Sequence, residues 1–102
     1  MIQLIEAHCA EIAKLCRHYH VERLEVFGSA ATATFRPEAS DLDFLVEFKS
    51  VAAMNKADQY FGLLTDLERL LRRNIDLVTA RSLRNPYFIA SVNKTRIPLY
   101  AA

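Results

Sequence analysis

The stretch that decides the fold runs from residue 26 to residue 47 and reads VFGSAATATFRPEASDLDFLVE. Glycine permits a sharp backbone turn and serine is a favoured N-cap, so the first half predicts a strand that ends at Gly28 and a short helix capped by Ser29. Pro37 disfavours helix in the residue before it, which predicts a loop. The alternation that follows predicts a second strand over 41–48.

The second strand carries two acids at alternate positions. Asp41 and Asp43 point to the same face and lie about 6.6 Å apart at Cα, because successive side chains of a strand alternate between faces. Leu45 and Glu47 share that face, whereas the opposite, core-facing side carries Leu42, Phe44, Val46 and Phe48. We expect the acidic end of this strand to open onto solvent or a ligand.

Apolar spacing predicts the elements outside this stretch. A first helix covers residues 2–19, with a buried stripe of Ile5, Cys9, Ile12, Cys16 and Tyr19. The others are strands over 22–27 and 74–78 and an extended edge over 97–100. Two more helices are expected, one from about Met54 or Asn55 to Arg72 and one from about Ser82 or Asn85 to Asn93. This order predicts an α+β fold, a small mixed β-sheet flanked by helices, in a single domain over residues 1–102.

Composition narrows the classes of function. The net charge is +1, with 13 basic and 12 acidic residues, so broad nucleic-acid binding is not expected. The cluster Arg69, Arg72 and Arg73 is explained by its place at a helix C-terminus. No apolar run approaches the roughly 20 residues of a membrane span, and the start of the chain lacks the pattern of a signal peptide. We therefore expect a cytoplasmic protein with no membrane partner.

Cysteine and histidine residues give no sign of a disulfide or a zinc site. Cys9 and Cys16 lie about 10 Å apart on a helix, which is too far for a disulfide, so both are interpreted as core residues of a reduced protein. His8, His18 and His20 lack partners at zinc-ligand spacing. They are interpreted as solvated or capping side chains.

A third acid, Asp76, changes the interpretation of Asp41 and Asp43. It is a lone carboxylate in an apolar strand and faces away from Ile75 and Leu77. If this strand lies beside the strand over 41–48 with the same face up, three carboxylates converge. Their mutual repulsion favours bound cations, and a pair of Mg²⁺ ions about 3.5–4 Å apart suits such oxygen ligands.

The Gly28–Ser29 turn supplies the second half of a candidate site. Its glycine allows close approach of a ligand, and unpaired N–H groups at the start of the next helix attract anions. Either feature alone has an ordinary structural explanation, as a plain turn or a solvated acidic face. A phosphate-binding turn combined with a metal-binding acid triad indicates in-line transfer at phosphorus.

The combination resembles a known family. Gly28-Ser29, then Asp41-Leu42-Asp43, then Asp76 within Ile75-Asp76-Leu77-Val78 is similar to the DNA polymerase β-type nucleotidyltransferase superfamily. Within it, the short chain resembles the minimal nucleotidyltransferases, above all the MntA-like antitoxins that pair with HEPN-domain toxins. The resemblance covers nearly the whole chain and implies the polymerase β-like nucleotidyltransferase fold.

The resemblance also implies an activity and its residues. Gly28 and Ser29 would bind the phosphates of ATP, and Asp41, Asp43 and Asp76 would hold two Mg²⁺ ions, with Asp76 also the base. Members of the antitoxin branch transfer AMP to a tyrosine of the HEPN toxin and so silence it. Relatives often carry Arg-Gly where this chain has Thr32-Ala33, and Arg36 is a candidate substitute for the missing phosphate contact.

Other functions stay open at this point. A catalytically weak antitoxin could neutralise its HEPN partner by binding alone, consistent with the Thr32-Ala33 departure. A small-molecule nucleotidyltransferase is a further alternative, although no segment is left over for a substrate domain. The edge over 97–100 and the leucine-rich helix leave self-association open.

Overall fold

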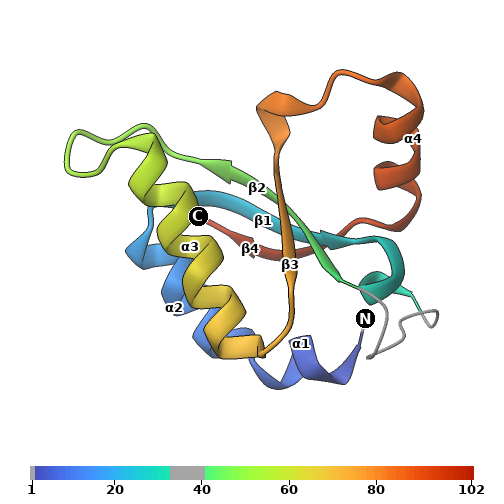
Figure 1. Ribbon diagram of the computed structural model, residues 1–102, viewed down its shortest axis with the longest axis horizontal. Coiled ribbons are helices and arrows are strands. Elements are labelled where there is room, and N and C mark those ends of the chain that lie inside the picture. Colours follow the sequence, from blue (N-terminus) through green and yellow to red (C-terminus); the bar gives the residue numbers. More distant parts are fainter. Residues whose placement is uncertain (1, 33–40) are drawn as a thin grey trace.

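Four strands form one mixed sheet at the centre of the fold (Figure 1). The computed structural model describes residues 2–32 and 41–102. The strands are β1 (Val21–Phe27), β2 (Leu42–Phe48), β3 (Ile75–Thr79) and β4 (Ile97–Ala101), in the order β3-β2-β1-β4. β1 is antiparallel to β2 and β4, whereas β2 and β3 are parallel. The predicted α+β fold is confirmed, and β4 occupies an edge as predicted.

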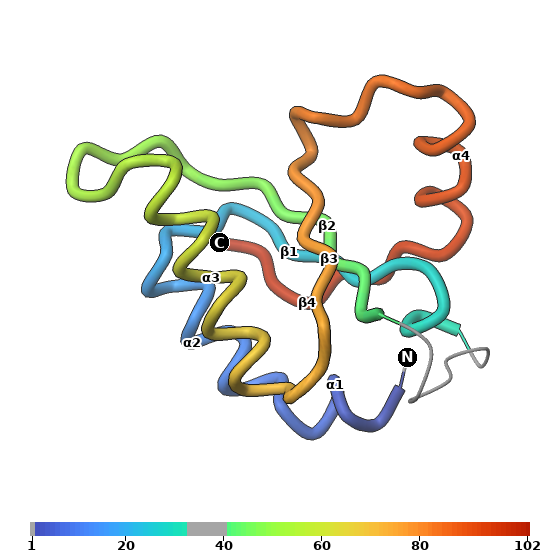
Figure 2. Tube along the Cα trace, in the orientation of Figure 1, coloured from blue at the N-terminus to red at the C-terminus, as the bar shows by residue number. Residues whose placement is uncertain are grey.

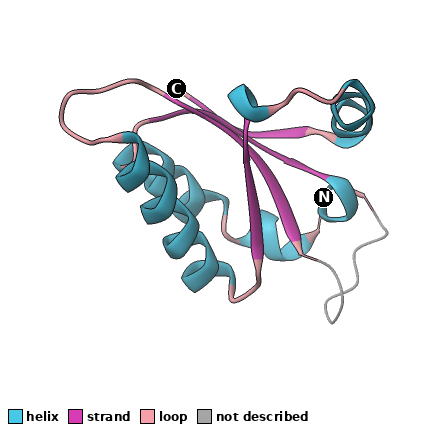
Figure 3. Cartoon of the chain, turned by 45° about the horizontal axis from the view of Figure 1, so that its top comes forward, coloured by secondary structure: helices cyan, strands magenta, loops and turns pink. Residues whose placement is uncertain are grey.

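Helices cover both faces of this sheet (Figure 3). The helices are α1 (Gln3–Ala7), α2 (Cys9–His18), α3 (Lys56–Leu71) and α4 (Pro86–Thr95), with short 3₁₀ turns η1 (Gly28–Ala31) and η2 (Ala80–Ser82). α2 and α3 pack together on one face, and α4 lies on the other (Figures 1 and 3). α3 is the crossover that the parallel pairing of β2 and β3 requires. None of the helices in the described residues is long and apolar enough to cross a membrane.

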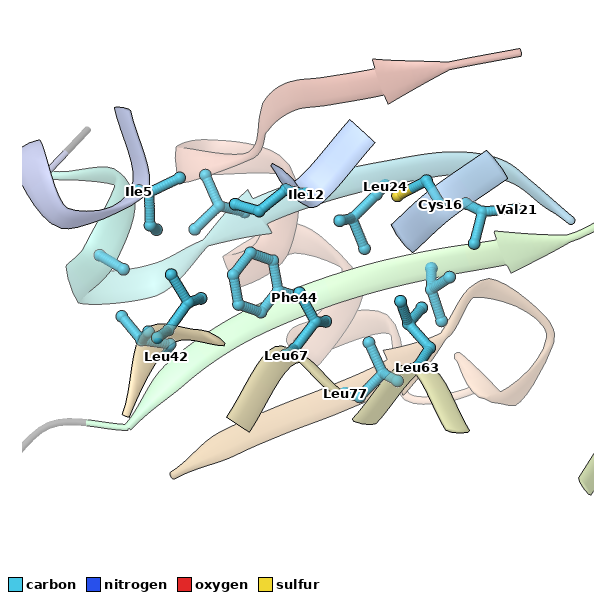
Figure 4. Packing of buried hydrophobic residues seen from close by; sticks show 14 of the residues in the cluster. Ile5, Ile12, Cys16, Val21, Leu24, Leu42, Phe44, Leu63, Leu67 and Leu77 are labelled. Carbon is cyan, nitrogen blue, oxygen red and sulfur yellow. The ribbon is translucent and has the colours of Figure 1, made fainter. Parts of the chain in front are cut away.

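The main hydrophobic core lies between the sheet and the α2–α3 pair (Figure 4). Leu42, Phe44 and Val46 of β2 are fully buried there, as the alternation in sequence predicts. They pack in one cluster with side chains of the helices, among them Ile12, Cys16, Leu63, Leu67 and Leu71. A second, smaller cluster of Phe27, Leu45 and Val92 lies under α4. The opposite face of β2 is therefore apolar at Leu45, where α4 covers it, and polar on either side, at Asp43 and Glu47.

The prediction of a single helix over 2–19 is wrong, because the helix is interrupted at His8. The Nδ1 atom of His8 lies 2.8 Å from the carbonyl oxygen of Leu4, the acceptor that the backbone N–H of His8 would need in a continuous helix. That N–H donates instead to the carbonyl of Ile5. The break separates α1 from α2, and Cys9 is exposed rather than part of the core.

Cys16 is buried as predicted, and burial raises its pKa to about 12, which leaves the thiol protonated and inert. The short helix after β1 also differs from expectation. It is a 3₁₀ turn that begins at Gly28, so Ser29 lies inside it rather than at its N-cap. The rest of that predicted helix, and the loop around Pro37, lie outside the described residues.

An ion pair between a buried glutamate and an exposed arginine joins the end of α4 to β1. Arg96, the residue after α4, donates from Nε and Nη2 to the two carboxylate oxygens of Glu25, at 2.8 and 2.5 Å. Glu25 is 8% exposed, and the hydrogen bonds from Arg96 lower its pKa. Sequence periodicity gave no hint of this pair, because its partners are 71 positions apart.

Removing Arg96 is expected to destabilise the fold. In Arg96→Met, Glu25 would keep its buried charge without a partner, and we expect a loss of about 2 kcal/mol in urea unfolding at pH 7. Because the folded-state pKa of Glu25 is lowered from 4.5, this stabilisation is complete above that value and lost as the pH falls through the folded-state pKa. The difference between variant and wild type should therefore shrink below about pH 4.5.

The control is Arg23→Met, which breaks the exposed pair that Arg23 forms with Glu47 at 2.7 Å. Exposed pairs contribute about 0–1 kcal/mol, so this variant should stay close to the wild type. Equal losses in the two variants would contradict a special role for the Glu25–Arg96 pair.

Candidate active site

The sheet register places two of the predicted site residues next to each other. In the parallel β2–β3 ladder Asp43 is paired with Asp76, so their side chains lie on the same face. On its other side Asp43 is paired with Phe27, the last residue of β1. The hydroxyl of Tyr60 on α3 donates to the carbonyl of Leu77 at 2.6 Å and ties β3 to α3 directly after Asp76. The expectation that β3 lies beside β2 with the same face up is met.

The environment of Asp43 disfavours its charge. The side chain is half-buried, and burial, followed by the negative charges of Asp76 and Asp41, raises the pKa of Asp43 from 3.8 to about 6. Asp76 and Asp41 are exposed. A carboxylate held among other negative charges marks a place where a cation would relieve repulsion.

The raised pKa of Asp43 has a measurable consequence for stability. The folded state binds this proton more tightly than the unfolded chain does, so stability contributed by Asp43 falls as the pH rises from about 4 to about 6. In metal-free buffer, Asp43→Asn should therefore raise the free energy of unfolding by about 1 kcal/mol at pH 8, after allowance for solvent screening, and change it little at pH 4.

Chemical denaturation at the two pH values, with a chelator present, measures this difference. Asp58→Asn is the control because Asp58 lies exposed in the first turn of α3, where its carboxylate is favourable. A gain in Asp58→Asn as large as that in Asp43→Asn, or none in Asp43→Asn, would contradict the interpretation.

Gly28 fits tightly against Asp43. Its φ of +71° lies in the left-handed region, and a methyl group added there would lie 2.6 Å from Oδ2 of Asp43. Its N–H donates to Oγ1 of Thr95, the last residue of α4, at 2.8 Å. Figure 2 shows the end of α4 returning beside the turn that follows β1. Glycine is therefore required here both for its backbone conformation and for the space next to a carboxylate.

The structure describes two of the other predicted site residues, Ser29 and Asp41. Ser29 lies in η1, directly after Gly28, and Asp41 directly precedes β2. Arg36 and Ala33 lie outside the described residues. Thr95 was not predicted from the sequence, because nothing in its local pattern sets it apart from other helical threonines.

The donor chemistry of this corner fits a hard divalent cation. Carboxylate oxygens are the ligands that Mg²⁺ prefers, and burial, followed by the charges of Asp76 and Asp41, raises the pKa of Asp43. Within residues 2–32 and 41–102, no three His, Cys, Asp or Glu side chains are already gathered closely enough to hold a metal ion. The expected convergence of three carboxylates is therefore not seen in the described residues: the register pairs Asp43 with Asp76, and Asp41 lies one residue before β2.

A cavity of about 370 Å³ lies elsewhere, between the C-terminal ends of β2 and β3 and the start of α3. Phe48, Tyr60 and Thr79 are among its lining residues. None of the predicted site residues that the structure describes lines it. The carboxylate corner is therefore separate from this cavity.

Comparison with known proteins agrees with this arrangement. The profile of the family described as nucleotidyltransferase domain matches residues 9–99. The chain belongs to this nucleotidyltransferase family. The match contains every acid and the glycine turn that the register brings together.

Relatives of this nucleotidyltransferase agree in length as well as sequence. A protein of Methanocaldococcus jannaschii, named as a candidate protein adenylyltransferase, is 34% identical over 79 residues, which cover 78% of this chain and 77% of the relative. A solved structure described as a candidate minimal nucleotidyltransferase is 31% identical, with a TM-score of 0.76 and coverage of 95% and 96% of the two chains.

A second similar structure comes from a toxin–antitoxin pair. It is described as a tri-AMPylated Shewanella oneidensis HEPN toxin in complex with MNT antitoxin. The matched chain is 20% identical to this nucleotidyltransferase, with a TM-score of 0.64 and coverage of 95% of this chain and 72% of that one. At this identity the likeness shows a shared fold.

Proposed function

We propose that this nucleotidyltransferase moves AMP from ATP to a tyrosine hydroxyl of a partner HEPN-type toxin and acts as its antitoxin. The observation that carries the proposal is the pairing of Asp43 with Asp76 beside the left-handed Gly28 turn. It combines acidic ligands for a metal–triphosphate with a backbone turn that a phosphate can approach. The toxin as acceptor is suggested by the AMPylated HEPN toxin in the similar Shewanella complex.

Each residue has a role in this scheme. The turn at Gly28 and Ser29 would receive the phosphates of ATP, and Asp41, Asp43 and Asp76 would hold two Mg²⁺ ions. When bound, these ions neutralise the triphosphate and stabilise the attacking and leaving oxygens of an in-line displacement. Asp76, which is exposed at the edge strand, accepts the proton of the tyrosine hydroxyl. The tyrosine oxygen then bonds to the α-phosphorus, and pyrophosphate leaves.

Protein mass spectrometry tests the activity. The chain is incubated with ATP, Mg²⁺ and a HEPN-type protein that it binds, and the intact mass of that protein is measured. We expect a gain of one or more AMP units, located on tyrosine by peptide mapping, and none when ATP is omitted. A partner that binds the chain but gains no mass would contradict the proposal.

Neutralisation by binding alone is the second candidate, and a surface of α4 favours it. Tyr87 is 85% exposed and Phe88 is 40% exposed, and exposed aromatic side chains are typical of protein interfaces. Growth of cells that express the toxin separates the two. Protection by a catalytically dead variant that is lost on Tyr87→Ser would support binding, whereas failure of the dead variant to protect would support AMP transfer.

A further inference from the structure

The last turn of α4 reaches the glycine turn through one side chain. Thr95 accepts the Gly28 N–H at 2.8 Å through Oγ1, across 67 positions of sequence. The next residue, Arg96, donates two hydrogen bonds to Glu25 of β1. Two successive residues therefore hold the end of β1 on either side of Phe27, which is itself paired with Asp43. The position of Thr95 is consequently fixed relative to the carboxylates.

The hydroxyl of Thr95 has unused hydrogen-bonding capacity. A threonine hydroxyl offers one proton and two acceptor lone pairs, and the Gly28 N–H occupies one lone pair. Within residues 2–32 and 41–102, the Thr95 hydroxyl donates to no acceptor. Because Thr95 is only half-buried, that proton is accessible to an incoming acceptor.

The anion nearest to this hydroxyl would be the one bound at Gly28. The N–H of Gly28 is already satisfied by Thr95, so this donor is not available to a phosphate. The Thr95 hydroxyl is the alternative donor: one lone pair accepts the hydrogen bond from the Gly28 N–H, and the hydroxyl proton is left for another acceptor. A phosphate oxygen near Gly28–Ser29 is the acceptor that such a relay suits, since hydrogen bonds to charged groups are stronger than neutral ones.

We propose that Thr95 is a further ATP-binding residue, which holds the Gly28 turn in place and donates its hydroxyl proton to a phosphate oxygen of the bound nucleotide. The inference rests on the proposed function, because it takes Gly28–Ser29 as the phosphate site. It gives α4, which lies outside the β1–η1–β2 segment, a direct part in substrate recognition.

Three variants and one ligand test this proposal. Thr95→Val keeps the shape but removes the hydroxyl, Thr95→Ser keeps the hydroxyl, and Thr65→Val makes the same change at an exposed site on α3. Affinity for the non-hydrolysable ATP analogue AMP-PNP is measured with Mg²⁺ by calorimetry, and the amide resonance of Gly28 is followed by NMR. We expect affinity to fall about tenfold or more in Thr95→Val, and to stay within about threefold in Thr95→Ser and Thr65→Val.

The Gly28 amide resonance should shift in Thr95→Val and not in Thr65→Val. A Thr95→Val variant that is less stable but binds AMP-PNP as the wild type does would overturn the proposal, because Thr95 would then be structural only. A wild type that binds no AMP-PNP would overturn the proposed function and this inference with it. Normal wild-type binding combined with an insensitive Thr95→Val overturns the inference alone.

Discussion

Asp43→Asn is expected to reduce AMP transfer by more than about 100-fold. Asp43 is the one carboxylate in the site that is half-buried, and it lies between Phe27 and Asp76 across three strands. Loss of an outer partner of a metal ligand commonly costs about 10–100-fold, so loss of a ligand itself should cost more. Steady-state rates of AMP incorporation with saturating ATP and Mg²⁺ measure the effect.

This loss should occur in a protein that is at least as stable as the wild type, because the substitution removes an unfavourable charge at neutral pH. Asp58→Asn, with the same chemical change on the exposed start of α3, should retain full activity. Substantial transfer by a folded Asp43→Asn protein would refute the proposed role of this carboxylate.

Gly28→Ala is expected to lose both activity and stability. A non-glycine residue in the left-handed region costs roughly 1–2 kcal/mol. The added methyl group would also collide with Oδ2 of Asp43, so either the turn or the carboxylate must move. We expect a loss of about 2 kcal/mol, equivalent to a fall in Tm of about 10 °C, and AMP transfer near background. Thermal unfolding and the transfer assay at 20 °C or below measure the two effects.

Gly62→Ala is the matched control. Alanine in a helix interior usually adds about 1 kcal/mol of stability relative to glycine, but a methyl group at Gly62 in α3 would collide with the ring of Tyr19. This variant should therefore also lose stability, while its folded fraction keeps normal activity. If Gly28→Ala kept activity to the same degree as Gly62→Ala, the close fit of Gly28 and Asp43 would have no bearing on the reaction.

The sequence allowed the local half of the site to be predicted. Alternation within β2 separates Asp43 from the core residues, and the Gly28 turn is visible because glycine has a specific backbone use. The meeting of Asp43 with Asp76 was conditional, since alternation says which face a residue occupies but not which strand lies beside it. Only the parallel ladder formed through α3 settles that point.

Contacts over long sequence distances were missed. Gly28 with Thr95 and Glu25 with Arg96 join β1 to the far end of the chain, and neither pair has a local pattern. Gln59 is another case: it is buried in α3 and donates to the carbonyls of Tyr19 and Lys49. The break at His8 was missed for a different reason, because a side chain there competes for a backbone acceptor within an otherwise helical pattern.

The parallel pairing of β2 with β3 also bears on the order of folding. The two strands are separated by the 16-residue helix α3, so their ladder forms only after α3 has crossed the sheet and docked. A contact that closes such a long loop is entropically costly and belongs to the later stages of folding. The repulsion between Asp43 and Asp76 is therefore absent while the early contacts of β1, β2 and α2 form. It arises only when β3 docks and Leu77 completes the main core, whose burial offsets the cost.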